Sequence, residues 1–431
     1  MKARTWLAVI LAATLAGCGP QESGQPVLRV SNWGGAGDDG PFERMVQAKN
    51  REFGERNKAV VKVEGIPGEY VPKMLLNFVA GSQPDVMVVD ASSAAVFVNN
   101  GLLQDLTPFI EKDPEFKLSD YYENVLGTYA RDKNGKRAIY AIPNDFTPMV
   151  MYYNKDLFDA VGVPYPKPGW TFDDFLETAK KLTVLDGKTQ RYGFVYTNWM
   201  PGWVMWLWNN GGDVLDEKGF AAGALDSGKN IETMTFLRDL ATKHRVAPTL
   251  SEAASMGVDL FANGQAAMTV SGHWAIVGYK SAKAIKWDRL GVVEFPHNTP
   301  ESHTVLYMSA YGIPKDAKNP ELAWKYIKMW TSRELQTEYQ STGIAVCARI
   351  DVSQMRAGLD NHHASPEMMI ERSFLPIIPT GRPPAGSRIE GYEIVEKHGT
   401  SAMQSILNGA DVAATLKSTA ARIDAEFAKS R

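Results

Sequence analysis

Short apolar strands alternate with helices along this chain. Residues 27–30, 60–63 and 85–90 are predicted strands, and the segments between them have apolar residues near helical spacing. Alternation of this kind predicts an α/β fold, in which helices cover both faces of a largely parallel sheet. A second series of strands and helices begins after Pro143.

The N-terminus has the pattern of a secretory signal peptide over residues 1–17. Lys2 and Arg4 precede an apolar stretch, and the sequence Leu-Ala-Gly-Cys that ends at Cys18 resembles a bacterial lipobox. Cleavage there would make Cys18 the first residue, with its sulfur acylated and residues 18–26 as a polar tether. The apolar run is shorter than the roughly 20 residues that span a bilayer, which disfavours a transmembrane anchor.

The length of the mature chain predicts two lobes. Removal of residues 1–17 leaves 414 of the 431 residues, whereas a single hydrophobic core stops growing at roughly 250 to 300 residues. Loss of Lys2 and Arg4 leaves 44 Lys and Arg against 49 Asp and Glu, a formal net charge of about −5. That balance argues against a nucleic-acid partner, which would need a basic face.

Local signals mark several helix ends. Thr171 precedes a predicted helix to Leu182, and Asp174 supplies the second half of a capping box. Pro320 opens an amphipathic helix that reaches Trp330. We further predict a helix at 259–263, a strand at 267–270, and mostly helical structure from residue 367 to the end. Cys347 has no partner if Cys18 carries lipid, so we expect a buried free thiol.

Nine stretches together resemble the extracellular solute-binding proteins of ABC importers, in the sugar-binding group that includes maltose-binding protein. They are GSQPDV (81–86), GLLQDL (101–106), YAIP (140–143), YYNKDLF (152–158), GWTFDDF (169–175), FANGQAAM (261–268), SGHW (271–274), YGIP (311–314) and KNPELAW (318–324). Each is weak alone, but they follow the family order across nearly the whole mature chain. The resemblance implies a monomeric receptor with two lobes that close around a solute, of the type II periplasmic-binding-protein fold.

The same resemblance implies where the chain crosses between lobes. The three crossings would lie near residues 144–147, 306–310 and 343–347. The N-terminal lobe would then be residues 27–143 plus about 311–342. The C-terminal lobe would be about 148–305 plus 348–431. Ligands in open α/β sheets bind beyond the carboxyl ends of strands, which places Trp33, Asp90, Ser92 and Tyr311 beside the cleft.

Aromatic side chains are candidates for stacking on the apolar face of a sugar. Trp274 is favoured because the family commonly carries a sugar platform at the matching position. Trp199 and Trp203 either stack on the ligand or fill a core, and Trp33 either stacks or packs the base of its loop. Trp206 and Trp208 lie inside a predicted helix, so we expect them in a core.

Polar candidates would accept or donate hydrogen bonds to sugar hydroxyls. Asp145 lies in the first crossing and Asp90 ends a strand, and a carboxylate makes charge-assisted hydrogen bonds. Arg388 either reaches the cleft or forms a surface salt bridge.

The sequence has no Gly-x-Ser-x-Gly elbow, no His-Glu-x-x-His and no phosphate loop, so we expect no enzyme, no cofactor and no metal site. The expected function is a lipid-tethered, exported receptor, periplasmic or at the cell surface, that passes a sugar or short oligosaccharide to a membrane permease. A polyol phosphate or another polar metabolite is the alternative ligand. A secreted glycoside hydrolase is the alternative of another class.

Overall fold

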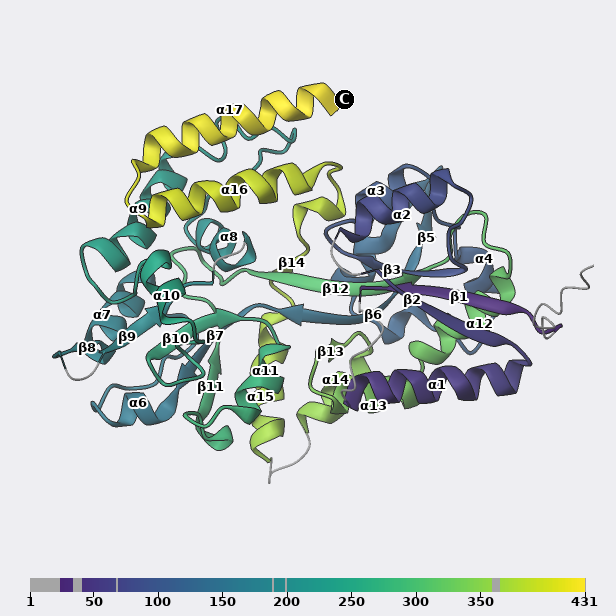
Figure 1. Ribbon diagram of the computed structural model, residues 1–431, viewed down its shortest axis with the longest axis horizontal. Helices are drawn as coiled ribbons and strands as arrows, with labels where there is room; N and C mark the ends of the chain where they lie inside the picture. The colour runs from purple at the N-terminus through teal and green to yellow at the C-terminus, as the bar shows by residue number, and fades with distance from the viewer. Residues whose placement is uncertain are drawn as a thin grey trace, which may run out of the picture.

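The computed structural model describes residues 24–33, 41–66, 69–187, 190–197, 200–358 and 365–430. Two α/β lobes lie side by side (Figure 1). Two long strands, β6 (Ala141–Pro148) and β12 (Thr304–Gly312), run between the lobes. The predicted two-lobed α/β architecture is therefore confirmed.

The N-terminal lobe is built around the larger sheet. Among the described residues this sheet has seven strands in the order β13-β6-β12-β3-β1-β2, with β14 (Gly381–Arg382) paired to β12. The other elements of the lobe are β1 (Val27–Asn32), α1 (Pro41–Asn57), β2 (Val60–Gly65), α2 (Tyr70–Val79), β3 (Val86–Asp90), α3 (Ala94–Asn99), α4 (Thr107–Glu111), α5 (Glu123–Leu126), β4 (Ala130–Lys133), β5 (Lys136–Ile139), α12 (Pro320–Trp330), α13 (Arg333–Ser341) and β13 (Val346–Cys347).

The C-terminal lobe is built around the smaller sheet. Over the described ranges its strand order is β11-β7-β10-β9-β8. Its elements are β7 (Val150–Asn154), α6 (Lys155–Asp159), α7 (Phe172–Leu182), β8 (Val184–Leu185), β9 (Gln190–Val195), α8 (Met200–Trp208), α9 (Gly228–Thr242), α10 (Leu250–Met256), β10 (Ala266–Ser271), α11 (Ala275–Ser281), β11 (Leu290–Val293), α15 (Pro366–Phe374), α16 (Tyr392–Leu407) and α17 (Val412–Ser430).

Both sheets are mixed, so the prediction of a largely parallel sheet is wrong. Strands β1, β2 and β3 pair in parallel as expected, but β12 is antiparallel to both β3 and β6. In the other sheet β7 is antiparallel to β10 and β11. The reason is connectivity: β6 carries the chain out of the N-terminal lobe and β12 carries it back, so these neighbours run in opposite directions.

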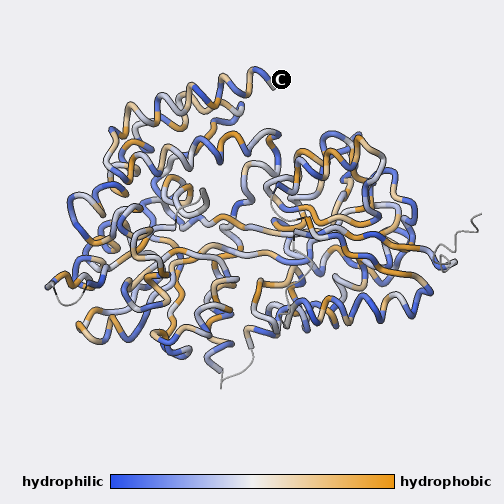
Figure 2. Tube along the Cα trace, in the orientation of Figure 1, coloured by the Kyte–Doolittle hydropathy of each residue, from blue (hydrophilic) through white to orange (hydrophobic). Residues whose placement is uncertain are grey.

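The hydrophobic cores divide at these long strands. Phe146 of β6 and Leu306 of β12 are buried in a cluster of the N-terminal lobe. Met149 and Val305 are buried in the large cluster of the C-terminal lobe. The chain therefore changes lobes within a few residues on each strand. Figure 2 shows hydrophobic residues along the strands at the centre of the molecule.

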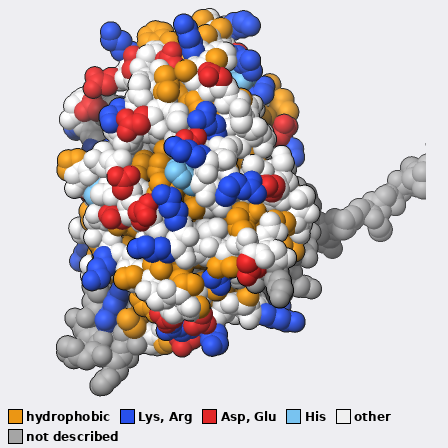
Figure 3. Space-filling model, turned by 90° about the vertical axis from the view of Figure 1, so that its left-hand side faces the viewer, with side chains coloured by type: hydrophobic (Ala, Val, Ile, Leu, Met, Phe, Trp, Pro, Cys, Tyr) orange, Lys and Arg blue, Asp and Glu red, His pale blue; other side chains and the backbone are white. Residues whose placement is uncertain are grey.

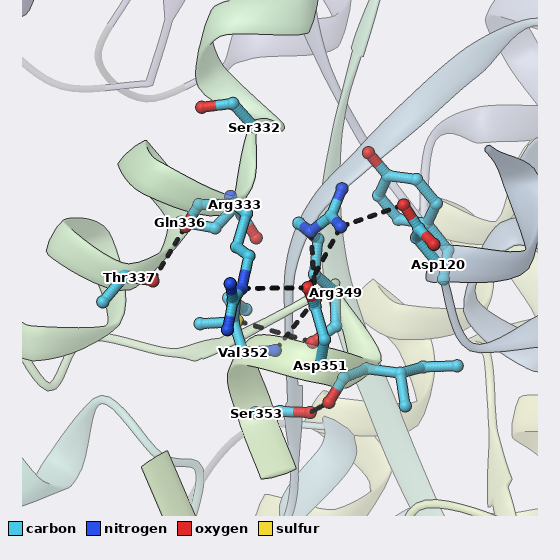
Figure 4. A network of polar contacts seen from close by, with 12 residues as sticks. Asp120, Ser332, Arg333, Gln336, Thr337, Arg349, Asp351, Val352 and Ser353 are labelled. Atoms are coloured by element: carbon cyan, nitrogen blue, oxygen red, sulfur yellow. Dashed lines mark hydrogen bonds and ion pairs between the residues drawn. The ribbon is translucent and has the colours of Figure 1, made fainter. Parts of the chain in front are cut away.

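Helix α14 (Ile350–Ala357) contacts both lobes, because it packs on α13 and β13 on one side and on α15 on the other. Arg349 Nη2 donates to Asp120 at 2.9 Å, and its Nε donates to Asp351 at 3.0 Å (Figure 4). Arg333 Nε lies 3.3 Å from the other oxygen of Asp351. Tyr122 and Ser353 share a hydrogen bond of 2.9 Å. These contacts join α14 to α13 and to the segment before α5.

Several local predictions are confirmed. Thr171 and Asp174 form both hydrogen bonds of the capping box at the start of α7. Proline stands in the first turn of α12, as predicted. Cys347 is a buried free thiol, and burial raises its pKa. Residues 259–263 form turns rather than the predicted helix, because Gly264, at φ +71°, ends the single turn begun at Asp259.

The surface carries both signs of charge. On the end of the molecule formed by the C-terminal lobe, acidic and basic side chains are interspersed (Figure 3). Within the described ranges, no helix combines the length and the apolar character that a membrane crossing requires.

Candidate functional site

A groove of about 1390 Å³ opens between the two lobes. We call it the interlobe groove. Its N-terminal wall is formed by α2 and α3, and its C-terminal wall by residues 217–219, 388–396 and Phe427. In Figure 1 these walls lie above the crossing strands, with α2 and α3 on one side and α16 and α17 on the other.

The two walls differ in chemistry. The wall from α2 is mainly apolar and includes Val71, Pro72, Leu75, Phe78 and Val79. The opposite wall carries the acidic side chains Glu217, Glu390, Glu393 and Glu396 and the basic side chains Lys218 and Arg388. A groove with one apolar wall and one wall rich in hydrogen-bond acceptors suits a ligand that has an apolar face and polar edges.

The end of β3 places hydroxyls in the N-terminal wall. Ser92 and Ser93 line the groove, and both side chains donate to the Asp90 carboxylate behind them, Ser93 at 2.7 Å. The backbone N–H of Ser93 donates to the same carboxylate at 3.0 Å. Asp90 therefore orders the turn that presents the two serines, as well as adding negative charge close to the groove.

Glu396 is the half-buried acid of the opposite wall. Burial, with added repulsion from Asp90 and Glu393, raises the pKa of Glu396 to about 7. Asp90 of the N-terminal lobe therefore lies close enough to Glu396 of the C-terminal lobe to repel its carboxylate. Tyr307 of β12 lies near both acids: burial raises the pKa of Tyr307, and Glu396 and Asp90 add to that effect.

Trp274 lies apart from the lining of the interlobe groove, at the junction with the crossings. Its side chain is 38% exposed. A Cβ on Gly272 would lie 2.3 Å from the Trp274 ring and 2.5 Å from Thr147 Cγ2 in the first crossing. Glycine at 272 thus allows the indole to lie close over the backbone, next to β6.

Asp145 ties the crossing segments together. Its Oδ2 accepts hydrogen bonds from Asn144 at 2.8 Å, Ser309 of β12 at 2.8 Å and Tyr339 of α13 at 2.6 Å. Burial raises the pKa of Asp145, and these hydrogen bonds partly offset that effect. Asp145, which the sequence predicted as a ligand contact, therefore joins β6 to β12 and α13 by hydrogen bonds.

Two further predicted residues pack in cores. Trp203 is 1% exposed within the large C-terminal cluster, so its ring does not reach a ligand in this conformation. Tyr311 packs edge-on against Tyr326, and also against Trp330. The sequence left Trp203 open between ligand and core and placed Tyr311 beside the cleft from the position of the strand ends, because sequence alone does not reveal which face of an element meets the core. Trp206 and Trp208 are buried, as predicted.

Of the remaining predicted residues, one lines the groove, one packs beside it and two lie outside the described residues. Arg388 is exposed in the groove wall. Trp33 is 42% exposed and packs edge-on against Tyr70, with ring centroids 6.2 Å apart. Tyr70 itself lines the groove. Trp199 and Cys18 lie outside the described residues.

Sequence reasoning missed Tyr70, Glu393 and Glu396. Tyr70 opens α2 and hydrogen-bonds Ser31 at 2.8 Å and the Val88 carbonyl at 2.9 Å. The sequence did hold a signal for the two acids. Glu393 and Glu396 follow Gly391 and are three residues apart, which puts both on one side of a helix. In the described part of the chain, no group of three or more His, Cys, Asp or Glu side chains is arranged to hold a metal ion.

Comparisons with known proteins agree with this architecture. A binding protein of Brucella abortus is 24% identical, with both chains fully covered. The arabinooligosaccharide-binding protein of Halalkalibacterium halodurans is 30% identical over 48% of this chain and 44% of its own length. The solved structure of an ABC substrate-binding protein of Listeria monocytogenes, in complex with cycloalternan, has a TM-score of 0.79 at 24% identity, covering 94% of this chain and 99% of that one.

A family model gives the assignment. The model for the bacterial extracellular solute-binding protein family matches residues 34–337. That range contains most of the N-terminal lobe, both long crossing strands and the sheet of the C-terminal lobe. On the strength of this match and the two-lobed fold, the chain belongs to the bacterial extracellular solute-binding protein family.

Proposed function

We propose that this protein captures a sugar or short oligosaccharide between its lobes and delivers it to the permease of an ABC importer. The observation that carries the proposal is the interlobe groove, with an apolar wall from one lobe and an acidic wall from the other. The names of an arabinooligosaccharide-binding relative and of a structural neighbour in complex with cycloalternan support it.

The chemistry of the two walls suits a carbohydrate. Carboxylates of Glu393 and Glu396 can each accept hydrogen bonds from sugar hydroxyls, and the serine hydroxyls at 92 and 93 can donate or accept. We propose that the exposed indole of Trp274, which lies beside the first crossing and outside the lining of the groove, stacks on a sugar ring of a ligand that extends to that point. A ligand that touches both lobes stabilises the closed arrangement, since only that arrangement offers all of the contacts.

A polyol phosphate is less well matched to this groove. The acids of the C-terminal wall outnumber Lys218 and Arg388, so a phosphate would meet net negative charge. Glu396 and the nearby Asp90 would also repel an anion at the base. We therefore favour an uncharged carbohydrate.

The same proposal includes attachment to a membrane through lipid on Cys18 after removal of residues 1–17. Acyl chains contribute about 0.8 kcal/mol per buried methylene, so two or more chains give durable attachment. We further propose that the protein acts as a monomer without chemical turnover of its ligand. For the lobes, we propose an N-terminal lobe of residues 27–143 plus about 311–342 and a C-terminal lobe of about 148–305 plus 348–431, with α14 in contact with both.

A thermal-shift panel tests the function. Maltose, maltotriose, arabinotriose, cellobiose and ribitol are compared with glycerol 3-phosphate, since a ligand that binds only the folded state raises the melting temperature. We expect one carbohydrate to stabilise the protein at micromolar concentration. Stabilisation by glycerol 3-phosphate alone would favour the phosphate receptor. Steady release of monosaccharide from the oligosaccharides would contradict the receptor and favour a hydrolase.

A further inference from the structure

A buried polar network joins the two lobes beside Trp274. His273 follows β10 in the C-terminal lobe and is fully buried. Its Nδ1 lies 3.1 Å from the carbonyl oxygen of Gly343, just after α13 of the N-terminal lobe. Its Nε2 lies 3.1 and 3.0 Å from the two carboxylate oxygens of Glu371, which is buried on α15.

The chemistry of the partners fixes the hydrogens. A backbone carbonyl only accepts, so Nδ1 of His273 carries a hydrogen and donates it to Gly343. The hydrogen bond between Nε2 and Glu371 needs a hydrogen on one of the two partners, because two bare acceptors cannot bond to each other. Gln340 of α13 extends the network, because its Nε2 donates to Glu371 at 3.5 Å and its Oε1 accepts from the backbone of Cys347 at 3.4 Å.

The segment that carries Trp274 therefore touches the other lobe at several points. Gly272 lies against Thr147 of the first crossing, and the Val277 side chain lies 3.8 Å from the Cβ position of Gly343. His273 stands between these contacts, one residue before the exposed indole. A shift of the Gly343 backbone would move the imidazole and, through the shared backbone, Trp274.

We propose that His273 is a positioning residue, which holds Trp274 at a fixed place relative to the N-terminal lobe so that a stacked solute meets both lobes. The inference rests on the proposed function. A binding group whose neighbours are locked by buried hydrogen bonds loses less freedom when the ligand arrives, so the network favours tight binding. The bond to Gly343 joins the two lobes, which distinguishes it from a hydrogen bond that stabilises one lobe alone.

Two substitutions of His273 test its hydrogen bonds to Gly343 and to Glu371 one at a time. His273→Asn keeps a donor near the position of Nδ1, whereas His273→Gln keeps one near Nε2 and loses the bond to Gly343. The chain offers a matched control in His398, which is 8% exposed and whose Nε2 lies 2.8 Å from Glu426 within the C-terminal lobe. His398→Gln makes the same substitution at a His–Glu pair that joins α16 to α17 and does not reach the other lobe.

Affinity is measured by calorimetric titration with maltotriose and arabinotriose. We expect His273→Gln to weaken binding at least fivefold, His273→Asn to recover most of that loss, and His398→Gln to stay within twofold of the wild type at a similar loss of melting temperature. Equal affinities for the glutamine variants at 273 and 398 would overturn the positioning role and leave His273 as a stabilising residue.

Small-angle X-ray scattering of the ligand-free protein tests the network without a ligand. Loss of the bond to Gly343 should let the lobes separate, so His273→Gln should have a larger radius of gyration than the wild type and His398→Gln. An unchanged radius would overturn the proposal. If the wild type binds no carbohydrate, the proposed function fails, while the scattering result still decides whether His273 holds the lobes together.

Discussion

Replacement of Glu396 by glutamine should stabilise the protein at alkaline pH and leave it unchanged at acidic pH. Burial and the neighbouring carboxylates raise the pKa of Glu396 from 4.5 to about 7. One pKa unit is worth about 1.36 kcal/mol, so a pKa difference of about 2.5 corresponds to about 3 kcal/mol of folding free energy. Partial exposure of the side chain reduces this free energy to about 2 kcal/mol. Glutamine keeps the size of the side chain and removes the charge.

The sign follows from proton binding. Between pH 4.5 and about 7 the folded state holds a proton on Glu396 that the unfolded state has released, so the stability of the wild type falls as the pH rises through this range. The groups that face Glu396 include Asp90, Glu393, Tyr307 and Tyr392, and the two tyrosines stay neutral there. The variant lacks this contribution, so the two free energies of unfolding should agree at pH 4 and differ at pH 8.

Urea unfolding at both pH values measures the difference. Glu426→Gln is the control of opposite sign, because the hydrogen bond with His398 lowers the pKa of Glu426, and its loss should destabilise the folded state above that pKa. A Glu396→Gln variant no more stable than the wild type at pH 8 would show that burial and the acidic neighbours do not disfavour the charged form of Glu396 in the folded state.

Three further predictions concern binding and attachment. Trp274→Ala should weaken carbohydrate binding by more than about 1 kcal/mol in calorimetry with an unchanged circular dichroism spectrum, and full affinity would refute the stacking role. Gly272→Ala should lower the melting temperature and move the indole emission, because its Cβ would meet the Trp274 ring at 2.3 Å; an unaltered spectrum and melting temperature would contradict this packing. Cys18→Ser should move the protein from the membrane fraction to the soluble fraction, and continued pelleting with membranes would count against lipid attachment.

The sequence by itself determined the local structure and the overall class. Alternation of strands and helices, together with a length too great for one core, predicted two α/β lobes. The capping box at Thr171 and Asp174 was predictable because its two hydrogen bonds join residues three apart in the chain. Burial of Trp206 and Trp208 followed in the same way from their place inside an apolar helix.

The tertiary structure alone decided which of the candidate residues meet. Asp145 and Trp203 have the right chemistry for a sugar site, but Asp145 bonds to two other segments of the chain and Trp203 is enclosed by the core. The antiparallel pairing of β6 with β12 likewise depends on how the chain returns between the lobes. Glu396 faces Asp90 only after folding brings together residues some three hundred positions apart, and no local pattern encodes a contact at that separation.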